Sequence, residues 1–219
     1  MKFEDGGVGS TEPPRSGAPA PPARGRDRGV GSTEPPRSGA PAPPARERDL
    51  DGRIGEGWGG LSPNGAHINV VLAHRGSPTA AAAVSMFAHP SPGHTPVLVC
   101  VGPDQPSYEP VWPPTLMMNK ATPVNERHQT LTWGAGQLGI AQGVLDAVAD
   151  GLLEPTGDVY VLVAIWIDGD ANDETALRQA ARDATRKAIG VCVEGRDPGA
   201  ARALVERRDS VQSPFYAGD

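Results

Sequence analysis

The distribution of large apolar residues most constrains what this chain can fold into. Between Glu4 and Asp49 the only ones are Val8 and Val30, so this stretch cannot bury a hydrophobic core. From about Ile54 onward, apolar residues are frequent enough for one compact domain, which would bury on the order of 70% of its unfolded surface. We therefore expect a disordered tail over residues 1–53 and a single folded domain over residues 54–219.

The tail contains an internal duplication. Residues 7–24 and 29–46 carry the same text, rich in Pro, Ala and Gly. A leucine-rich solenoid would need leucines to stack its repeats, and the duplicated segments have none. The composition instead indicates a linker with polyproline II character. The alternative interpretation is a docking segment for a domain that recognises proline-rich peptides, for instance at Pro41–Pro44.

Composition also excludes several classes of protein. Two distant cysteines, Cys100 and Cys192, rule out a disulfide-rich secreted scaffold and a cysteine-based zinc site. No run of about 18 apolar residues is present, so no membrane-spanning helix is expected. The first residues lack the apolar region of a signal peptide, which indicates a cytoplasmic protein. The net charge of −6 argues against a nucleic-acid partner.

The folded part is predicted to contain four strands. Each candidate is a β-branched or otherwise apolar run bounded by Gly or Pro, or it shows alternating polarity. Val159–Ile167 is the most apolar run and is typical of a central strand. The others are Ala66–Ala73, Val97–Val101 and Thr115–Thr122.

Three helices are predicted between and after these strands. Thr79–Ala88 is rich in alanine, with Ser77 as its expected N-cap, and Gln137–Leu152 has the apolar stripe of an amphipathic helix. A C-terminal helix should bury one face, marked by Leu177, Ala181, Ala184 and Ala188. Two strands follow each other without a helix, so the sheet is not purely parallel. The predicted fold class is α+β, a mixed β-sheet covered by helices.

Two sequence motifs resemble known sites without their required context. Gly134–Gly139 matches the G-x-G-x-x-G spacing of dinucleotide-binding proteins, but that motif must follow a strand, and residues 126–133 indicate a helix or loop. A dinucleotide-dependent oxidoreductase would need a strand ending just before Gly134. Residues 168–172 resemble the start of a calcium loop, but the sixth and twelfth positions are Asp173 and Gln179 instead of Gly and Glu.

Two polar pairs on predicted strands are better candidates for a site. Residues two apart on a strand share a face, so His67 and Asn69 should project together, as should Lys120 and Thr122. Each pair needs water, a hydrogen-bond partner or a ligand, and an edge strand facing solvent would also explain it. Of these residue types, only histidine ordinarily titrates close to neutral pH, which makes His67 the candidate for proton transfer.

Several separate motifs of the folded part resemble the formaldehyde-activating enzyme family, the tetrahydromethanopterin hydro-lyases. They occur in the family's order and at nearly its spacing between His67 and Trp166. The matching segments are Ala66–Ile68, Arg75–Pro78, Gly93–Thr95, Leu98, Met118–Thr122, Gly134–Gln137, Asp146–Gly151 and Asp158–Val163.

The resemblance implies a fold like domain 2 of ribosomal protein S5 and a homopentamer with pterin sites in the clefts between subunits. It implies that His67 is the proton donor. It further implies that the pterin substrate is contacted by Asn69, Leu98, Lys120, Thr122 and Gln137. No metal and no permanently bound cofactor are expected, since tetrahydromethanopterin or a related reduced pterin is a co-substrate.

The function that the resemblance implies is condensation of formaldehyde with a tetrahydropterin, in one-carbon metabolism or formaldehyde detoxification. The alternative is a non-catalytic module of the same fold that binds pterin or senses formaldehyde. Position 69 separates the two, because the family has His-Ile-Asp where this chain has His67-Ile68-Asn69. An amide keeps the shape of the aspartate and loses its charge. Met117-Met118 and Asp168-Gly169 also depart from the family pattern.

Overall fold

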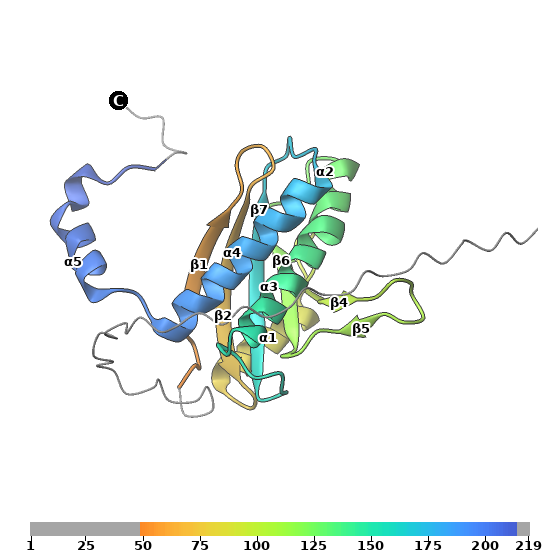
Figure 1. Cartoon of the computed structure of the whole chain (residues 1–219), viewed down its shortest axis with the longest axis horizontal. Coiled ribbons are helices and arrows are strands. Elements are labelled where there is room, and N and C mark those ends of the chain that lie inside the picture. The colour runs from red at the N-terminus through yellow and green to blue at the C-terminus, as the bar shows by residue number, and fades with distance from the viewer. Residues whose placement is uncertain (1–48, 214–219) are drawn as a thin grey trace, which may run out of the picture. The chain divides into compact units, whose positions relative to one another are not determined.

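The computed structural model describes residues 49–213 (Figure 1). Its main element is a five-stranded mixed sheet with the strand order β1-β2-β7-β6-β3. Only the β7–β6 pair is parallel, and the other three pairs are antiparallel. The strands are β1 (Ile54–Gly59), β2 (Ala66–His74), β3 (Val97–Leu98), β6 (Thr115–Asn119) and β7 (Val159–Ile167).

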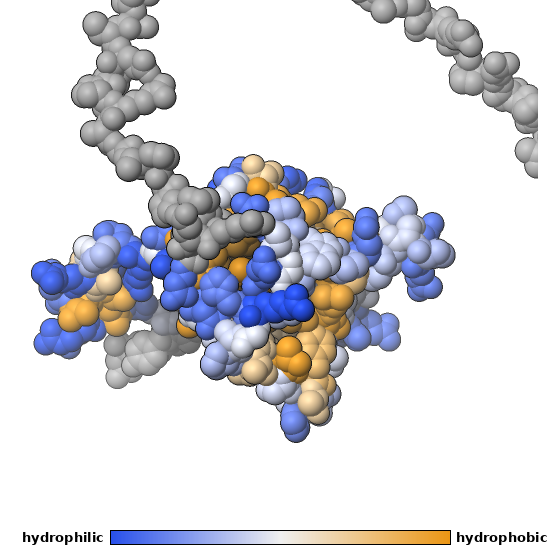
Figure 2. Space-filling model, turned by 90° about the horizontal axis from the view of Figure 1, so that it is seen from below, coloured by the Kyte–Doolittle hydropathy of each residue, from blue (hydrophilic) through white to orange (hydrophobic). Residues whose placement is uncertain are grey.

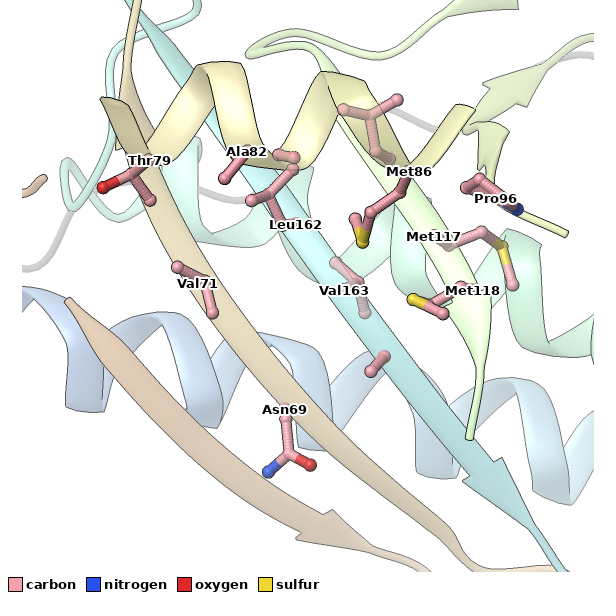
Figure 3. A pocket seen from close by; sticks show the side chains of 13 residues that line it. Asn69, Val71, Thr79, Ala82, Met86, Pro96, Met117, Met118, Leu162 and Val163 are labelled. Atoms are coloured by element: carbon pink, nitrogen blue, oxygen red, sulfur yellow. The ribbon is translucent and has the colours of Figure 1, made fainter. Parts of the chain in front are cut away.

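Helices cover the two faces of this sheet unequally. α3 (Gln137–Ala149) and α4 (Glu174–Glu194) pack on one face, which we call the covered face. α1 (Pro78–Ala88) lies across part of the opposite face, with the sheet between it and α4 (Figure 3). We call this second face the open face, because the strand side chains on it stay partly exposed.

The remaining elements lie outside the five-stranded sheet. β4 (Cys100–Val101) and β5 (Glu109–Pro110) form a second, two-stranded sheet. α2 (Glu126–Leu131) continues through a π-helical turn, η2 (Thr132–Gly136), directly into α3. α5 (Pro198–Glu206), which buries none of its residues, and the 3₁₀ turn η3 (Arg208–Ser210) follow α4.

The core lies between the sheet and the α3–α4 layer. Inward residues alternate along β2 and β7, as the period of two requires, and the predicted inner face of β2 is confirmed. The predicted face of α4 is likewise fully buried. These residues are Ile68, Val70 and Leu72 on β2 and Leu177, Ala181, Ala184 and Ala188 on α4, all 0% exposed.

β1 was not predicted, and its packing explains why. Its inward positions are Gly55, Gly57 and Gly59, which carry no apolar side chain to reveal the strand period. A Cβ atom at these glycines would lie 2.0–2.1 Å from backbone carbonyl oxygens of α4, at Ala188, Ala184 and Ala180 respectively. The glycines therefore allow the backbone of β1 to approach α4 closely.

The predicted α+β class with a mixed sheet is confirmed, and Ser77 does cap α1 by accepting a hydrogen bond from the amide of Ala80 at 3.0 Å. Two strand predictions were wrong in extent. Val97–Val101 is divided at Val99 between two sheets, because the Val99 amide donates to Thr115 while its carbonyl accepts from Val111. Thr115–Thr122 ends at Asn119, which folds back on the following turn by donating to the carbonyl of Ala121.

The folded part starts before the predicted boundary at residue 53. Leu50 is 1% exposed and belongs to the core, and the Gly52 amide donates to Leu72 at 2.9 Å. Asp51 accepts a hydrogen bond from Thr79 of α1 at 2.9 Å. The predictions about the duplicated tail fall on residues 1–48, outside the described residues. Within residues 49–213, no helix has both the length and the apolar character needed to cross a membrane.

Candidate active site

Three neighbouring strands place the candidate acid on the open face, in register with two tryptophans. The strand register sets His67 of β2 directly opposite Trp58 of β1 on one side and Trp166 of β7 on the other. Lys120 follows β6 immediately and is fixed by its amide, which donates to the carbonyl of Ile165 at 2.7 Å. We call Trp58, His67, Trp166 and Lys120 the His67 row; they line a pocket of about 290 Å³.

His67 has a charged partner at each ring nitrogen. Its Nε2 lies 2.8 Å from Oε2 of Glu56, and its Nδ1 lies 3.2 Å from Nζ of Lys120. The ring of Trp58 is 5.5 Å from the imidazole ring and 5.7 Å from the ring of Trp166, measured between centroids. The histidine side chain keeps 33% of its surface exposed, so a small substrate can still reach it.

Lys120 has altered proton affinity. Burial lowers the pKa of its ammonium group to about 8, and the negative charge of Glu56 opposes this effect. The lysine is therefore charged at neutral pH but within reach of titration. An ammonium group that releases its proton this readily can take part in proton transfer beside His67.

A second row of the open face leads from the His67 row into an apolar groove. Glu56 stands opposite Asn69, which stands opposite Ala164, which in turn faces Met118. Asn69 lies at one end of a groove of about 340 Å³ between α1 and the sheet (Figure 3). The groove is otherwise lined mostly by apolar side chains, among them Val71, Ala82, Met86 and Leu162.

The turn after β6 carries Thr122 into a separate small cluster. The side-chain amide of the buried Asn119 donates to the carbonyls of Gly93 and Ala121, so it ties this turn to the loop around residue 93. Thr122 Oγ1 lies 3.4 Å from Nε2 of His94. Since the strand ends at Asn119, the prediction that Lys120 and Thr122 share a strand face was wrong.

Leu98 and Gln137 lie on other parts of the protomer. Leu98 is opposite Leu116 on the edge strand β3 and is 43% exposed. Gln137 begins α3, and its side-chain amide donates to the carbonyl of Cys100, at 2.9 Å, and to the hydroxyl of Tyr108. The structure thus brings His67, Asn69 and Lys120 together on the open face, while Gln137 belongs to the helix layer of the covered face.

Sequence reasoning missed three residues that surround His67. Glu56 and Trp58 belong to the unpredicted strand β1, and Trp166 was treated only as part of an apolar strand. The alternation of glycine with other residues from Gly55 to Gly59 was the available signal for β1. It would have placed Glu56 and Trp58 on one face.

The structure shows the surroundings of the two motifs that resemble dinucleotide and calcium sites. Gly134–Gly139 spans the π-helical turn η2 and the start of α3, and α2 precedes it where a dinucleotide site needs a strand. The prediction that residues 126–133 form a helix or loop, and so do not supply the strand of a dinucleotide site, is confirmed. In the part of the chain from residue 49 to 213, no three or more His, Cys, Asp or Glu side chains are grouped so that they could hold a metal ion.

Hydrophobic surface remains exposed outside the core. Large apolar side chains of the described residues that stay exposed include Ile54, Trp58, Leu98 and Trp112. Figure 2 shows patches of hydrophobic surface among hydrophilic ones on one side of the molecule. Large contiguous apolar patches mark protein–protein or ligand contacts, whereas single exposed apolar side chains are ordinary.

Comparison with known proteins identifies the family. The family model described as formaldehyde-activating enzyme matches residues 54–216. The 5,6,7,8-tetrahydromethanopterin hydro-lyase of Methanosarcina barkeri is 36% identical over 168 residues, which cover 76% of this chain and 91% of the relative. The bifunctional enzyme Fae/Hps of Methanothrix thermoacetophila is 30% identical over 160 residues, 72% of this chain and 40% of that longer protein.

The match thus begins at the first residue of β1 and includes the whole His67 row. It also covers nearly the full length of a relative that is named for a single activity. The chain belongs to the formaldehyde-activating enzyme family.

Proposed function

We propose that this chain condenses formaldehyde with a tetrahydropterin of the tetrahydromethanopterin type, giving the methylene-pterin and water. Family membership supports this reaction class, and the related hydro-lyase of Methanosarcina barkeri is named for tetrahydromethanopterin. The observation that carries the proposal is the position of His67. It lies on the open face between a carboxylate and an ammonium group, with part of its surface accessible.

The reaction needs an acid at one step. Formaldehyde carbon first bonds to one nitrogen of the pterin, giving a carbinolamine. The carbon–oxygen bond then breaks, and the oxygen takes up a proton and departs as water, which leaves an iminium cation. The second nitrogen attacks that carbon, closes the ring and loses its proton. Hydroxide is a poor leaving group, so a positioned acid accelerates the step by about 10²–10⁴-fold.

His67 is the proposed acid, and Lys120 is its neighbouring proton source. The ammonium of Lys120 faces Nδ1 of His67 at 3.2 Å, and the pKa of about 8 keeps that proton exchangeable. Asn69 is a proposed contact to the pterin, which its position between Glu56 and the groove under α1 supports. An active site that holds both pterin nitrogens near attack geometry adds an entropic gain.

Leu98, Thr122 and Gln137 are further proposed contacts to the pterin. Gln137 and Leu98 lie on different parts of the protomer from His67, so a site that uses them all is best completed by a second copy of the chain. We therefore propose the homopentamer with pterin in the clefts between subunits that the family resemblance implies. A cytoplasmic location and the absence of a permanently bound cofactor belong to the same proposal.

A non-catalytic module is the competing function, and Asn69 is the observation that favours it. The amide at this position lacks the charge that the family's aspartate would bring beside His67. Glu56 supports the enzyme instead, because its carboxylate contacts His67 directly from the neighbouring strand. A module without catalysis would have no need for a charged group at each ring nitrogen.

Stopped-flow measurement of methylene-pterin formation above the spontaneous background tests the proposal. The wild-type chain should accelerate the reaction, and His67→Ala should lose most of that increment, about 10²-fold, while pterin binding falls little. His89→Ala, which alters an exposed histidine at the end of α1, is the matched control and should keep the increment. A wild-type chain that binds tetrahydromethanopterin without accelerating the reaction would establish the binding module instead.

A further inference from the structure

We propose that Glu56 is a positioning residue for this reaction: its carboxylate holds Nε2 of His67 and so directs Nδ1, with Lys120, toward the departing hydroxyl group. This inference rests on the proposed function, because it assigns the nitrogen of His67 from which the proton leaves. No resemblance or motif pointed to Glu56. Its position follows from the pairing of β1 with β2.

The hydrogen-bond chemistry of the three side chains permits one order of donors. A neutral imidazole has one nitrogen that donates and one that accepts, and an ionised carboxylate only accepts. Glu56 Oε2 at 2.8 Å therefore requires the proton on Nε2. Nδ1 is then the acceptor for the ammonium of Lys120 at 3.2 Å, since an ammonium group only donates. The order is Lys120 to His67 to Glu56.

This order determines how a proton can move. When Lys120 transfers a proton to Nδ1, the histidine becomes an imidazolium whose Nε2–H still faces the carboxylate. The negative charge of Glu56 then stabilises the cation that forms beside it. The departing hydroxyl group takes the proton from the Nδ1 edge and leaves as water, and solvent reprotonates Lys120. No electron transfer or further reactant is involved.

The surroundings of His67 leave its orientation to this pair of contacts. Trp58, whose ring lies 5.5 Å from the imidazole, limits where the ring can lie, but it holds no charge and does not choose which nitrogen is protonated. The charged groups that contact His67 are Glu56, from β1, and Lys120, from the turn after β6. Glu56 and Lys120 therefore fix the tautomer together.

Glu56 also supplies what position 69 lacks in this chain. The register places Glu56 directly opposite Asn69, so a carboxylate on either residue would stand close to His67, which is two residues from Asn69 on β2. With an amide at 69, the carboxylate that contacts His67 comes from β1. The charge that family resemblance predicts on β2 is thus available from the adjacent strand.

The test compares Glu56→Gln with a control on the same strand face. Ile54→Gln changes an exposed residue two positions before Glu56 on β1, which is not among the side chains that contact His67. We expect Glu56→Gln to lower kcat about tenfold, a part of what the acid contributes, while KM for tetrahydromethanopterin changes less than twofold. Ile54→Gln should keep both constants. Equal losses in the two variants would overturn the proposal.

A tautomer measurement separates positioning from a merely structural role. Nitrogen-15 shifts of the neutral His67 ring, assigned with His67→Ala, should show Nε2 protonated in the wild type and in Lys120→Met, where Glu56 alone holds the ring. Adding Glu56→Gln to Lys120→Met should give a mixture of tautomers. A Lys120→Met/Glu56→Gln variant in which Nε2 stays fully protonated would overturn the proposal even if kcat fell. If the wild type shows no acceleration and the tautomer still depends on Glu56, the proposed function fails and the positioning stands.

The last part of the test is a variant designed to rescue the activity lost in Glu56→Gln. Glu56→Gln combined with Asn69→Asp returns a carboxylate to the neighbourhood of His67 from β2. This double variant should recover at least a third of the kcat lost in Glu56→Gln. A folded double variant that recovers no kcat would overturn the proposal that a carboxylate beside His67 is what Glu56 supplies.

Discussion

The two faces of one sheet differ in what their residues do, although the same strands supply both. On β2, Ile68, Val70 and Leu72 are completely buried under the helix layer, while His67 and Asn69 alternate with them and stay accessible. The covered face is built from apolar side chains and from glycines that bring backbones together. The open face holds charged and aromatic groups in register. Strand alternation thus separates stability from chemistry.

Gly57→Val should break the covered face and has the largest expected effect. A Cβ at Gly57 would lie 2.1 Å from the carbonyl oxygen of Ala184 in α4, and neither backbone can move without disturbing the core. We expect a loss of about 4 kcal/mol in the free energy of unfolding, at the upper end of overpacking effects. Urea unfolding followed by circular dichroism measures it.

The control for this prediction lies on the opposite face of the same strand. Ile54→Ala changes a residue that is 70% exposed, so its free energy of unfolding should stay within about 0.5 kcal/mol of the wild type. Similar losses for the two variants would show that β1 does not pack on α4 through its glycines.

The same strand shows why part of the fold was not predictable. Sequence patterns identify an element by where its apolar side chains recur, and β2, β7 and α4 were predicted because their inward residues are apolar. β1 contributes only glycine to the core, so its period carries no hydrophobic signal. Leu50 was missed for a different reason: a single buried leucine before β1 has no periodic neighbours.

The candidate site was predictable in part for the same reason. His67 and Asn69 stood out as a polar pair on one predicted strand, and Lys120 stood out on another, before family resemblance assigned all three to the pterin site. Their meeting depends on β6 lying beside β7, two strands from β2, which no local pattern specifies. Glu56 was not predicted as a site residue because its strand, β1, was not predicted. Thr122 was misplaced because the side chain of Asn119 ends β6 early.

Lys120→Met tests whether the half-buried lysine of the open face lowers the stability of the folded chain. The pKa of Lys120 is about 8 in the folded chain and 10.5 ordinarily, so between these values the unfolded state binds more protons. Stability contributed by this residue therefore rises with pH from about 8 to 10.5 and is lowest below 8. Because the group is only half-buried, we expect about 1 kcal/mol between pH 7 and pH 9.5.

The measurement is the difference in unfolding free energy between wild type and Lys120→Met at the two pH values. It should shift in favour of the wild type at pH 9.5, since methionine does not titrate. Lys120→Arg keeps a charge at both pH values and should lack the rise as well. A rise that persists in Lys120→Met would assign it to another group and leave Lys120 as an ordinary contact residue.

Asn69→Asp has the smallest expected effect. It tests whether the carboxylate of Glu56 already supplies the negative charge that His67 needs. With Glu56 in contact with His67, a carboxylate at position 69 adds little to the stabilisation of the imidazolium and also repels Glu56, its cross-strand partner. We expect kcat to rise by about threefold or less, since this charge is exposed and screened. Asn69→Ala, which removes the amide without adding charge, controls for lost pterin contacts. A rise of tenfold or more in Asn69→Asp would show that Glu56 does not replace the family's aspartate, and the chain would then be an enzyme weakened at position 69.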